Sequence, residues 1–269
     1  MNIRRWGVGV LAATLFVPGL AACKSDEPAP AAGGPAASAV PSDPKEALLA
    51  SMKEIEKGNF TFVVTSDGDF AVSGTVHLPS KSAEMKMGGQ ATEDLTMQTH
   101  FVHIDADTWA LLEFGGAMAE MIPEVNALKG KYQHLDRSKI KDVKDLQFDF
   151  VDVDPAGTKP LIEAITEVEK TGEGAYAGTV DGSKATDSDW FDADTLKELG
   201  GKAGAVPFTA QLDGQGRLSK MTLQMPASAT SKAQEITVTY ADYGTATPVR
   251  KPPADKIVEA SDDVYDMLT

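Results

Sequence analysis

Cysteine is almost absent from this sequence, since Cys23 is the only one in 269 residues. A single cysteine cannot close a disulfide within the chain, and its neighbours lack the partners that a metal site requires. Long apolar runs are also scarce: after residue 22 none approaches the roughly 20 residues that a membrane-spanning helix needs. A disulfide scaffold and a multi-span membrane protein are therefore both excluded.

Catalytic motifs and positive charge are the next shortages. The sequence contains no G-x-S-x-G elbow, no phosphate-binding loop, no dinucleotide fingerprint and no H-E-x-x-H motif. We therefore expect a protein that is not an enzyme and that needs no cofactor. Lys and Arg number 25 against 40 Asp and Glu, for a net charge of −15. Such an acidic chain repels phosphate backbones and anionic headgroups, so nucleic acid is not an expected partner.

The N-terminal segment resembles an export signal. Two arginines precede an uncharged run that is too short to span a membrane, and the run ends in the sequence LAAC at Cys23. This pattern is similar to the lipobox of bacterial lipoprotein signals. It predicts that residues 1–22 are a signal peptide and that Cys23 carries the acyl chains of a lipid anchor on the extracytoplasmic face of the cell membrane. An ordinary secretory signal with a free thiol and export by the twin-arginine route stay open as alternatives.

Residues 23–42 are expected to be the lipidated cysteine and a flexible tether. The stretch from Lys24 to Ser42 contains mostly Ala, Pro, Gly and Ser, which have little to bury. A coil of this length spans about 25 Å on average. Residues 43–269 show no second linker, and we predict that they form one domain.

The domain is expected to begin with a helix. Asp43 is suited to cap it, Pro44 to occupy its first position, and apolar residues recur at three-to-four spacing until Gly58. The apolar residues predicted to share one face of this helix are Leu48, Leu49, Met52 and Ile55.

After the helix the apolar period changes to two, which predicts antiparallel strands. The segments expected as strands are 60–66, 70–78, 83–87, 95–104, 108–114, 149–154, one that ends near residue 180, two within 205–226 on either side of an Asp213-Gly214 turn, and one within 234–244. The segments 95–104 and 108–114 are apolar on both faces, so both faces should be covered. Short helices are expected near 114–132, 160–169 and 192–199.

The closing third carries the resemblance to a known family. An Asp213-Gly214 turn between two strands is followed by the stretch from Tyr240 to Gly244, YADYG, and then by a valine and a double proline. This order resembles the LppX/LprG family of actinobacterial lipoproteins. The resemblance implies an α+β fold with a single strongly bent antiparallel sheet, a LolA-like half-barrel, with helices covering its concave face. It also implies an apolar cavity that binds acylated lipid or glycolipid for carriage across the envelope, with a membrane transporter as a candidate partner.

A lipid-binding cavity would be lined by the apolar residues of the central strands and of the methionine-rich segment after them. Methionine is flexible and polarizable, which suits a surface that accepts variable apolar shapes. The candidate lining residues are Phe62, Val64, Met85, Met87, Met97, Phe101, Trp109, Leu111, Met118 and Met121. The alternative is an acidic, surface-anchored interaction or regulatory protein in which the same residues fill a solid core.

Two groups of residues, one of histidines and one of aspartates, contain the side chains that metal sites use. His100 and His103 are an odd number of residues apart, so on a strand they point to opposite faces and joint ligation is not expected. The cluster in DSDWFDAD could supply oxygen ligands to calcium, or Asp192 or Asp194 could simply cap the following helix. The residues of this cluster are Asp187, Asp189, Asp192 and Asp194.

Overall fold

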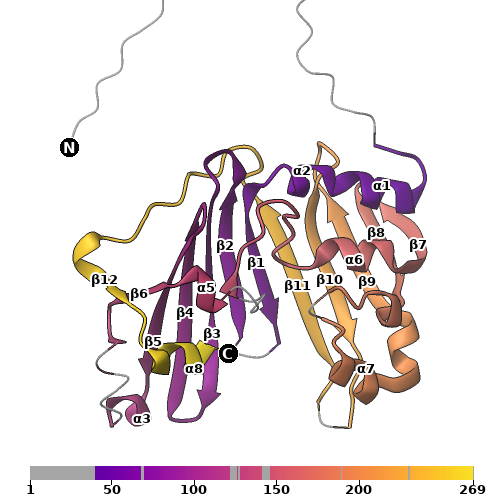
Figure 1. The fold of residues 1–269 in the computed structure, drawn as a ribbon. Helices are drawn as coiled ribbons and strands as arrows, with labels where there is room; N and C mark the ends of the chain where they lie inside the picture. The colour runs from indigo at the N-terminus through magenta and orange to yellow at the C-terminus, as the bar shows by residue number, and fades with distance from the viewer. Residues whose placement is uncertain are drawn as a thin grey trace, which may run out of the picture. The chain divides into compact units, whose positions relative to one another are not determined.

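The structure is a computed structural model that describes residues 40–67, 70–121, 126, 128–140, 146–188, 190–229 and 231–268. These residues belong to one compact unit of the chain. The unit is α+β and contains a single large sheet with short helices (Figure 1).

The strands are β1 (Asn59–Ser66), β2 (Ala71–His77), β3 (Ser82–Thr92), β4 (Leu95–Ile104), β5 (Asp107–Gly115), β6 (Tyr132–Leu135), β7 (Ile165–Gly172), β8 (Ala175–Val180), β9 (Val206–Leu212), β10 (Leu218–Met225), β11 (Gln234–Ala241) and β12 (Ile257–Glu259). Their order across the sheet is β12-β6-β5-β4-β3-β2-β1-β11-β10-β9-β8-β7, which leaves the sheet open with β12 and β7 at its edges. Neighbouring strands are antiparallel except β12 and β6, which are parallel.

The helices of the described residues are α1 (Pro44–Ser51), α2 (Lys53–Glu56), α3 (Ala117–Glu120), α5 (Arg137–Ile140), α6 (Thr158–Glu163), α7 (Ala193–Leu199) and α8 (Asp262–Leu268). The 3-10 turns with described bounds are η1 (Leu78–Ser80), η3 (Gly182–Lys184), η4 (Gly200–Ala205) and η5 (Ala254–Lys256). Side chains from α1, α6 and α7 pack on one face of the sheet, and those from α5 and α8 pack on the same face further along it. We call this the covered face and the opposite one the open face.

The first helix forms for the expected reasons. The side chain of Asp43 accepts a hydrogen bond from the backbone N–H of Glu46, and Pro44 occupies the first turn. Leu48 and Ile55 are fully buried. Leu49 was predicted to share their face, but it is 39% exposed. It follows Leu48 by a rotation of about 100°, which carries its side chain out of the buried stripe.

The start of the domain lies slightly earlier than expected. Residues 40–42, assigned to the tether, are described as part of the compact unit. A methyl carbon of Val40 lies 2.7 Å from the position that a Cβ on Gly216 would take. This contact with the β9–β10 turn places Val40 against the domain.

Two sequence predictions in the middle of the chain are wrong. The helix expected over 160–169 ends at Glu163, and β7 begins at Ile165. Leu161, Ile165 and Val168 are spaced as in a helix, but β-branched residues favour a strand. A turn at Gly174, where φ is +65°, then pairs β7 with β8.

The strand expected over 149–154 is absent. The Asp149 side chain accepts a hydrogen bond from the backbone N–H of Val151, and the Asp154 side chain accepts one from the N–H of Lys159. These local side-chain bonds satisfy backbone donors that a strand would give to its neighbour. The segment instead crosses the covered face as an irregular loop.

Candidate functional site

The centre of the covered face is built from cross-strand rows of apolar side chains. One row joins Tyr240, Phe62, Gly74, Met85 and Phe101 from β11 to β4. Because partners in register point to the same face, these residues line one continuous strip of the sheet. At Gly74 an added Cβ would lie 2.5 Å from the Phe62 ring, so the absence of a side chain there makes room for that ring.

The next rows lie toward the end of β3. Val64, Val72, Met87 and Thr99 are in register, and beyond them Gly89 pairs with Met97. The predicted residues that share the covered face are therefore Phe62, Val64, Met85, Met87, Met97 and Phe101.

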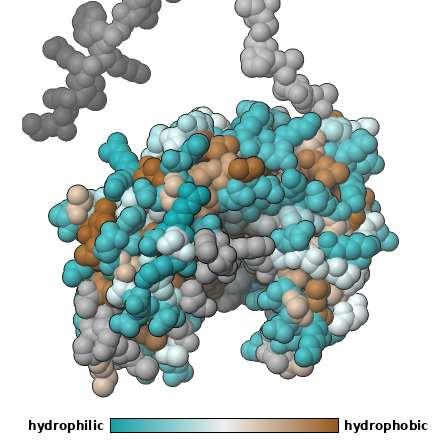
Figure 2. All heavy atoms as spheres, viewed as in Figure 1, coloured by the Kyte–Doolittle hydropathy of each residue, from teal (hydrophilic) through white to brown (hydrophobic). Residues whose placement is uncertain are grey.

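Exposure of these apolar side chains rises along the strip. Phe62 and Phe101 are 2% and 3% exposed, Met85 and Met87 are half-buried, and Met97 is 41% exposed. Figure 2 shows the same face hollowed in its lower middle, between the side that carries α8 and the side that carries α7. The strip thus combines a buried apolar floor with apolar side chains that keep part of their surface uncovered.

Two hydrophobic clusters flank this strip. The larger contains Phe62 and Val64 with residues of α1, α6 and α7, and the smaller contains Phe101 with residues of α5 and α8. Met85 packs against both clusters. The centre of the face is therefore the place where the two clusters meet.

The loop that crosses the covered face brings further aromatic residues to this centre. It runs from Leu146, buried in the smaller cluster, to Val153 in the larger one. Between them the rings of Phe148 and Phe150 lie 4.8 Å apart, centroid to centroid. The Phe148 ring also lies 5.7 Å from the imidazole of His103 on β4. Neither phenylalanine is among the predicted lining residues, since the alternation over 149–154 predicts a strand that contains Phe150 and leaves Phe148 just outside it.

His103 is a buried polar residue at this junction. It is 3% exposed, stacks on Phe101 at 6.0 Å, and its Nδ1 lies 3.1 Å from the Thr108 hydroxyl. Burial lowers the pKa of His103 from 6.5 to about 4. The ring is therefore neutral at neutral pH and behaves as one more flat apolar surface with a single hydrogen bond.

A buried polar pair fixes α6 against β11. The hydroxyl oxygens of Thr158 and Tyr240 are 2.6 Å apart, and both residues are buried. Burial, with the nearby Asp154 carboxylate, raises the pKa of Tyr240 well above its usual value. Burial also raises the pKa of Asp154, and its Oδ1 is buried without a hydrogen-bond partner among the described residues. The hydrogen bond between Thr158 and Tyr240 thus holds α6 beside the strip, on the side of the larger cluster.

The remaining predicted residues lie elsewhere. Trp109 pairs with Val102 and Leu111 pairs with His100, so both point to the open face, opposite Phe101. The expectation that they share the strip was wrong because β5 is apolar on both faces and its phase slipped by one. Met121 is 80% exposed. Met118 belongs to α3, and Cys23 lies outside the described residues.

Metal-ligand candidates are dispersed within the described part of the chain. His100 faces the open side, where its Nε2 lies 2.9 Å from the Glu84 carboxylate, whereas His103 faces the covered side. Asp192 caps α7 by accepting a hydrogen bond from the backbone N–H of Thr195. Asp189 lies outside the described residues. Among the described residues no group of three or more His, Cys, Asp or Glu side chains could hold a metal ion.

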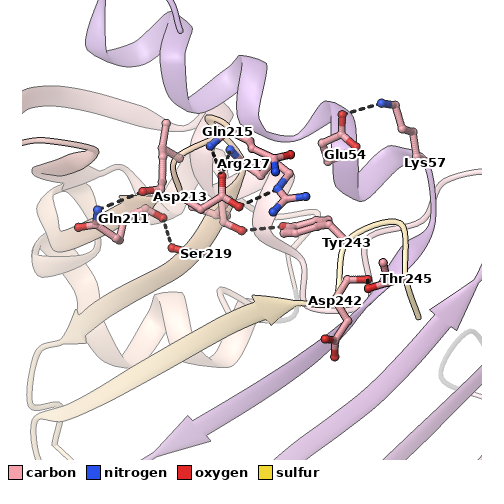
Figure 3. A network of polar contacts seen from close by, with 12 residues as sticks. Glu54, Lys57, Gln211, Asp213, Gln215, Arg217, Ser219, Asp242, Tyr243 and Thr245 are labelled. Atoms are coloured by element: carbon pink, nitrogen blue, oxygen red, sulfur yellow. Dashed lines mark hydrogen bonds and ion pairs between the residues drawn. The ribbon is translucent and has the colours of Figure 1, made fainter. Parts of the chain in front are cut away.

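The closing motif forms a network of polar contacts at the end of β11 (Figure 3). Asp213 accepts hydrogen bonds from the backbone N–H groups of Gln215 and Arg217 and from the Arg217 side chain. Although burial acts to raise it, these bonds hold the pKa of Asp213 below its usual value. The guanidinium of Arg217 lies 4.9 Å from the centre of the Tyr243 ring, and the Tyr243 hydroxyl donates to the Leu218 carbonyl.

This network explains why the quoted residues occur together. Asp242 has a φ of +54°, which turns the chain sharply after β11. Tyr243 then anchors the turned segment on the β9–β10 hairpin. The motif is a corner that directs the C-terminal segment away from β11, and none of its side chains lies in the apolar strip except Tyr240.

Comparisons with known proteins identify no family. No protein-family model matches this chain, and no curated protein matches it. Within the described residues no helix is both long enough and apolar enough to cross a membrane.

Some solved structures are distantly similar. One inactive mutant of the CurK dehydratase has 14% identity and a TM-score of 0.23, over 71% of this chain and 78% of that one. A second inactive mutant has 12% identity and a TM-score of 0.21, over 75% and 79%. The dehydratase domain from the CurK module of Curacin polyketide synthase has 11% identity and a TM-score of 0.21, over 76% and 80%. At these TM-scores the likeness supports no conclusion about this chain.

Proposed function

We propose that this protein is a membrane-anchored, extracytoplasmic lipoprotein that binds an acylated lipid or glycolipid on the covered face and carries it across the envelope. The observation that carries the proposal is the set of half-buried apolar side chains Val72, Met85 and Met87 on the covered face. Figure 2 shows this face of the molecule hollowed in its lower middle. In this reading the open sheet is a LolA-like half-barrel. Cys23 supplies the anchor, and a membrane transporter is a candidate partner for loading or release.

The chemistry of the strip suits acyl chains. Its side chains are aliphatic, thioether or aromatic, and the one buried imidazole is neutral at neutral pH. Burial of each methylene group contributes about 0.8 kcal/mol, so half-covering two sixteen-carbon chains contributes roughly 10 kcal/mol before the costs of binding. Binding on this scale requires no charged headgroup contact, and we infer that the protein acts as a carrier rather than as an enzyme.

The competing reading is an interaction or regulatory protein with a filled core. The contact of Met85 with both clusters is the observation that favours it, because continuous packing leaves no room for a ligand. The two readings differ in what a larger side chain does at the strip. In a hollow it displaces lipid, whereas in a filled core it strains the fold.

The test compares matched tryptophan substitutions on the two faces. Met87→Trp enlarges a half-buried residue of the strip, and Val63→Trp makes the same change on the open face, where Val63 is 43% exposed. The chain from residue 24 onward is purified without detergent from a bacterial host, and bound lipid is measured by native mass spectrometry and by extraction.

We expect the unsubstituted chain and Val63→Trp to retain acyl lipid, and Met87→Trp to lose most of it while keeping a similar melting temperature. An unsubstituted chain that is free of lipid, together with a Met87→Trp variant that unfolds, would support the filled core instead.

A further inference from the structure

The open face carries a groove that the apolar strip does not explain. After the corner at β11, residues 246–256 cross the open face as an extended strap, the yellow segment that leads to β12 in Figure 1. The backbone N–H of Val249 donates to the Ser82 hydroxyl at 3.0 Å, and the ammonium group of Lys251 lies 4.9 Å from the centre of the Trp109 ring. These contacts hold the strap over β3, β4 and β5.

A groove of about 800 Å³ lies between the strap and the sheet. Its floor is formed by Glu84, His100, Val102 and Tyr132. Its wall is formed by residues 247–253, which include three prolines. Proline has a fixed φ and no N–H to satisfy, so these three residues stiffen the wall and add apolar surface to it. The volume is in the range of small-molecule sites in proteins.

The polar groups of the floor form a chain of hydrogen bonds. The Nε2 atom of His100 lies 2.9 Å from the Glu84 carboxylate, and its Nδ1 lies 3.1 Å from the Tyr132 hydroxyl. Because a carboxylate only accepts, Nε2 carries a proton and donates to Glu84, while Nδ1 and the Tyr132 hydroxyl share one hydrogen bond. The Tyr132 oxygen keeps a lone pair, and the second Glu84 oxygen has only a long bond of 3.4 Å from Thr75. Both oxygens are available to accept hydrogen bonds from a ligand.

The ionisation of these groups is settled by their surroundings. The hydrogen bond from His100, with the charge of Lys86, lowers the pKa of Glu84 despite its partial burial. Burial and the charges of Glu84 and Glu113 raise the pKa of Tyr132. Glu84 is therefore an anion and Tyr132 a neutral phenol at neutral pH.

The strap adds positive charge to this floor. Arg250 and Lys251 line the groove and are exposed, against the one lining carboxylate, Glu84, which is already bonded to His100. Neither cation forms an ion pair with a carboxylate among the described residues. Among the lining residues two cations thus face one carboxylate, whereas the whole chain carries a net charge of −15. The two cations of the strap attract anions to this part of an otherwise acidic chain.

We propose that the strap groove binds a phosphate ester that also carries hydroxyl groups. Arg250 and Lys251 hold the phosphate, since guanidinium and ammonium groups are the usual phosphate ligands. Glu84 and Tyr132 accept hydrogen bonds from the hydroxyl groups. Val102 and the strap prolines contact the apolar C–H surface of the ligand. The ligand is either a free sugar phosphate or a repeating unit of a polyol-phosphate envelope polymer. This site lies on the face opposite the apolar strip and does not depend on lipid binding.

The test is titration calorimetry of the chain from residue 24 onward with glucose 6-phosphate, inorganic phosphate, glucose and a soluble poly(glycerol phosphate). We expect glucose 6-phosphate or the polymer to bind in the micromolar to millimolar range, and more tightly than inorganic phosphate or glucose. Binding of glucose 6-phosphate assigns the free sugar phosphate, and binding of the polymer alone assigns the polymer unit.

Variants connect the binding to the groove. Arg250→Gln should weaken it by about tenfold, the usual effect of losing one charge-assisted hydrogen bond. Tyr132→Phe should weaken the phosphate ester but not inorganic phosphate. Lys220→Gln, at an exposed lysine of β10 on the open face, is the matched control and should change nothing. The proposal is overturned if neither ester binds, if inorganic phosphate binds equally well, or if Arg250→Gln and Lys220→Gln behave alike.

Discussion

The buried imidazole of His103 predicts that the domain loses stability in mild acid. The pKa of His103 is about 4 in the folded protein, against 6.5 for an unburied histidine. A base whose folded pKa is depressed must be neutral for the fold to form without penalty. Its contribution is fully present above pH 6.5 and is lost as the pH falls toward 4.

The size of the loss follows from these two values. Between pH 8 and pH 4.5 this histidine becomes protonated in the unfolded chain but stays largely neutral in the folded chain. The difference lowers the free energy of unfolding by about 2.5 kcal/mol. For a domain of this size that is a fall of roughly 5–10 °C in melting temperature. His103 is 3% exposed, so solvent screening removes little of the effect.

The assay is the melting temperature as a function of pH for the chain from residue 40 onward and for two variants. His103→Gln has a side chain that does not titrate and that can still hydrogen-bond to Thr108, so its curve should be flatter between pH 6.5 and 4.5. His77→Gln, at the half-buried end of β2, should keep the original slope. Carboxylates that titrate in the same range are common to all three proteins and cancel in the comparison. Equal slopes for His103→Gln and the unsubstituted chain would refute the reasoning.

Three further predictions concern other contacts. Tyr240→Phe should lower the free energy of unfolding by about 1–3 kcal/mol, because it leaves the buried Thr158 hydroxyl without its partner. A double-mutant cycle that combines substitutions of Tyr240 and Thr158, measured by denaturant unfolding, should find the two positions coupled. Gly74→Val should destabilise by several kcal/mol in the same assay, because its Cβ would lie 2.5 Å from the Phe62 ring; a melting temperature equal to that of the unsubstituted chain would contradict this. Cys23→Ala should abolish lipidation, and unchanged acyl mass and detergent partitioning of the variant would disprove the anchor.

Much of the sheet could be predicted because alternation marks strands whose two faces differ. In β1 the buried residues are Phe60, Phe62 and Val64, and the residues between them are exposed or half-buried. In β9 every second residue from Val206 to Leu212 is buried. Such strands fix their own phase, since a slip by one residue would bury the polar set. The candidate residues of β1, β3 and β4 lie on one face of the sheet.

Elements with little periodicity were not predictable. β12 has three residues and β6 has four, which is too few to show a period. β12 is held by pairing with β6, and α8 is held by Val264, which is fully buried in the smaller cluster. Both depend on contacts with residues distant in sequence. Local propensity is a weak guide in such cases because tertiary packing decides.

The misplacement of Trp109 shows where alternation fails and what replaces it. Trp109, Ala110 and Leu112 are all at most 2% exposed, so β5 is apolar on both faces. Its sequence therefore does not indicate which residues point to which face of the sheet. The expectation that both faces are covered holds for the middle of β5 but not for the start of β4, where Thr96, Met97 and Gln98 are exposed. On the open face the cover of β5 is the strap, whose sequence shows no periodicity. The phase is set instead by pairing of Phe101 with Ala110, which leaves Trp109 on the open face between the His134 ring at 5.5 Å and the Lys251 ammonium group. The Lys251 ammonium group of the strap lies over the Trp109 ring, and the ring is 2% exposed. The same segment therefore covers the sheet and forms the wall of the groove, and removing it would expose Trp109 and abolish the groove.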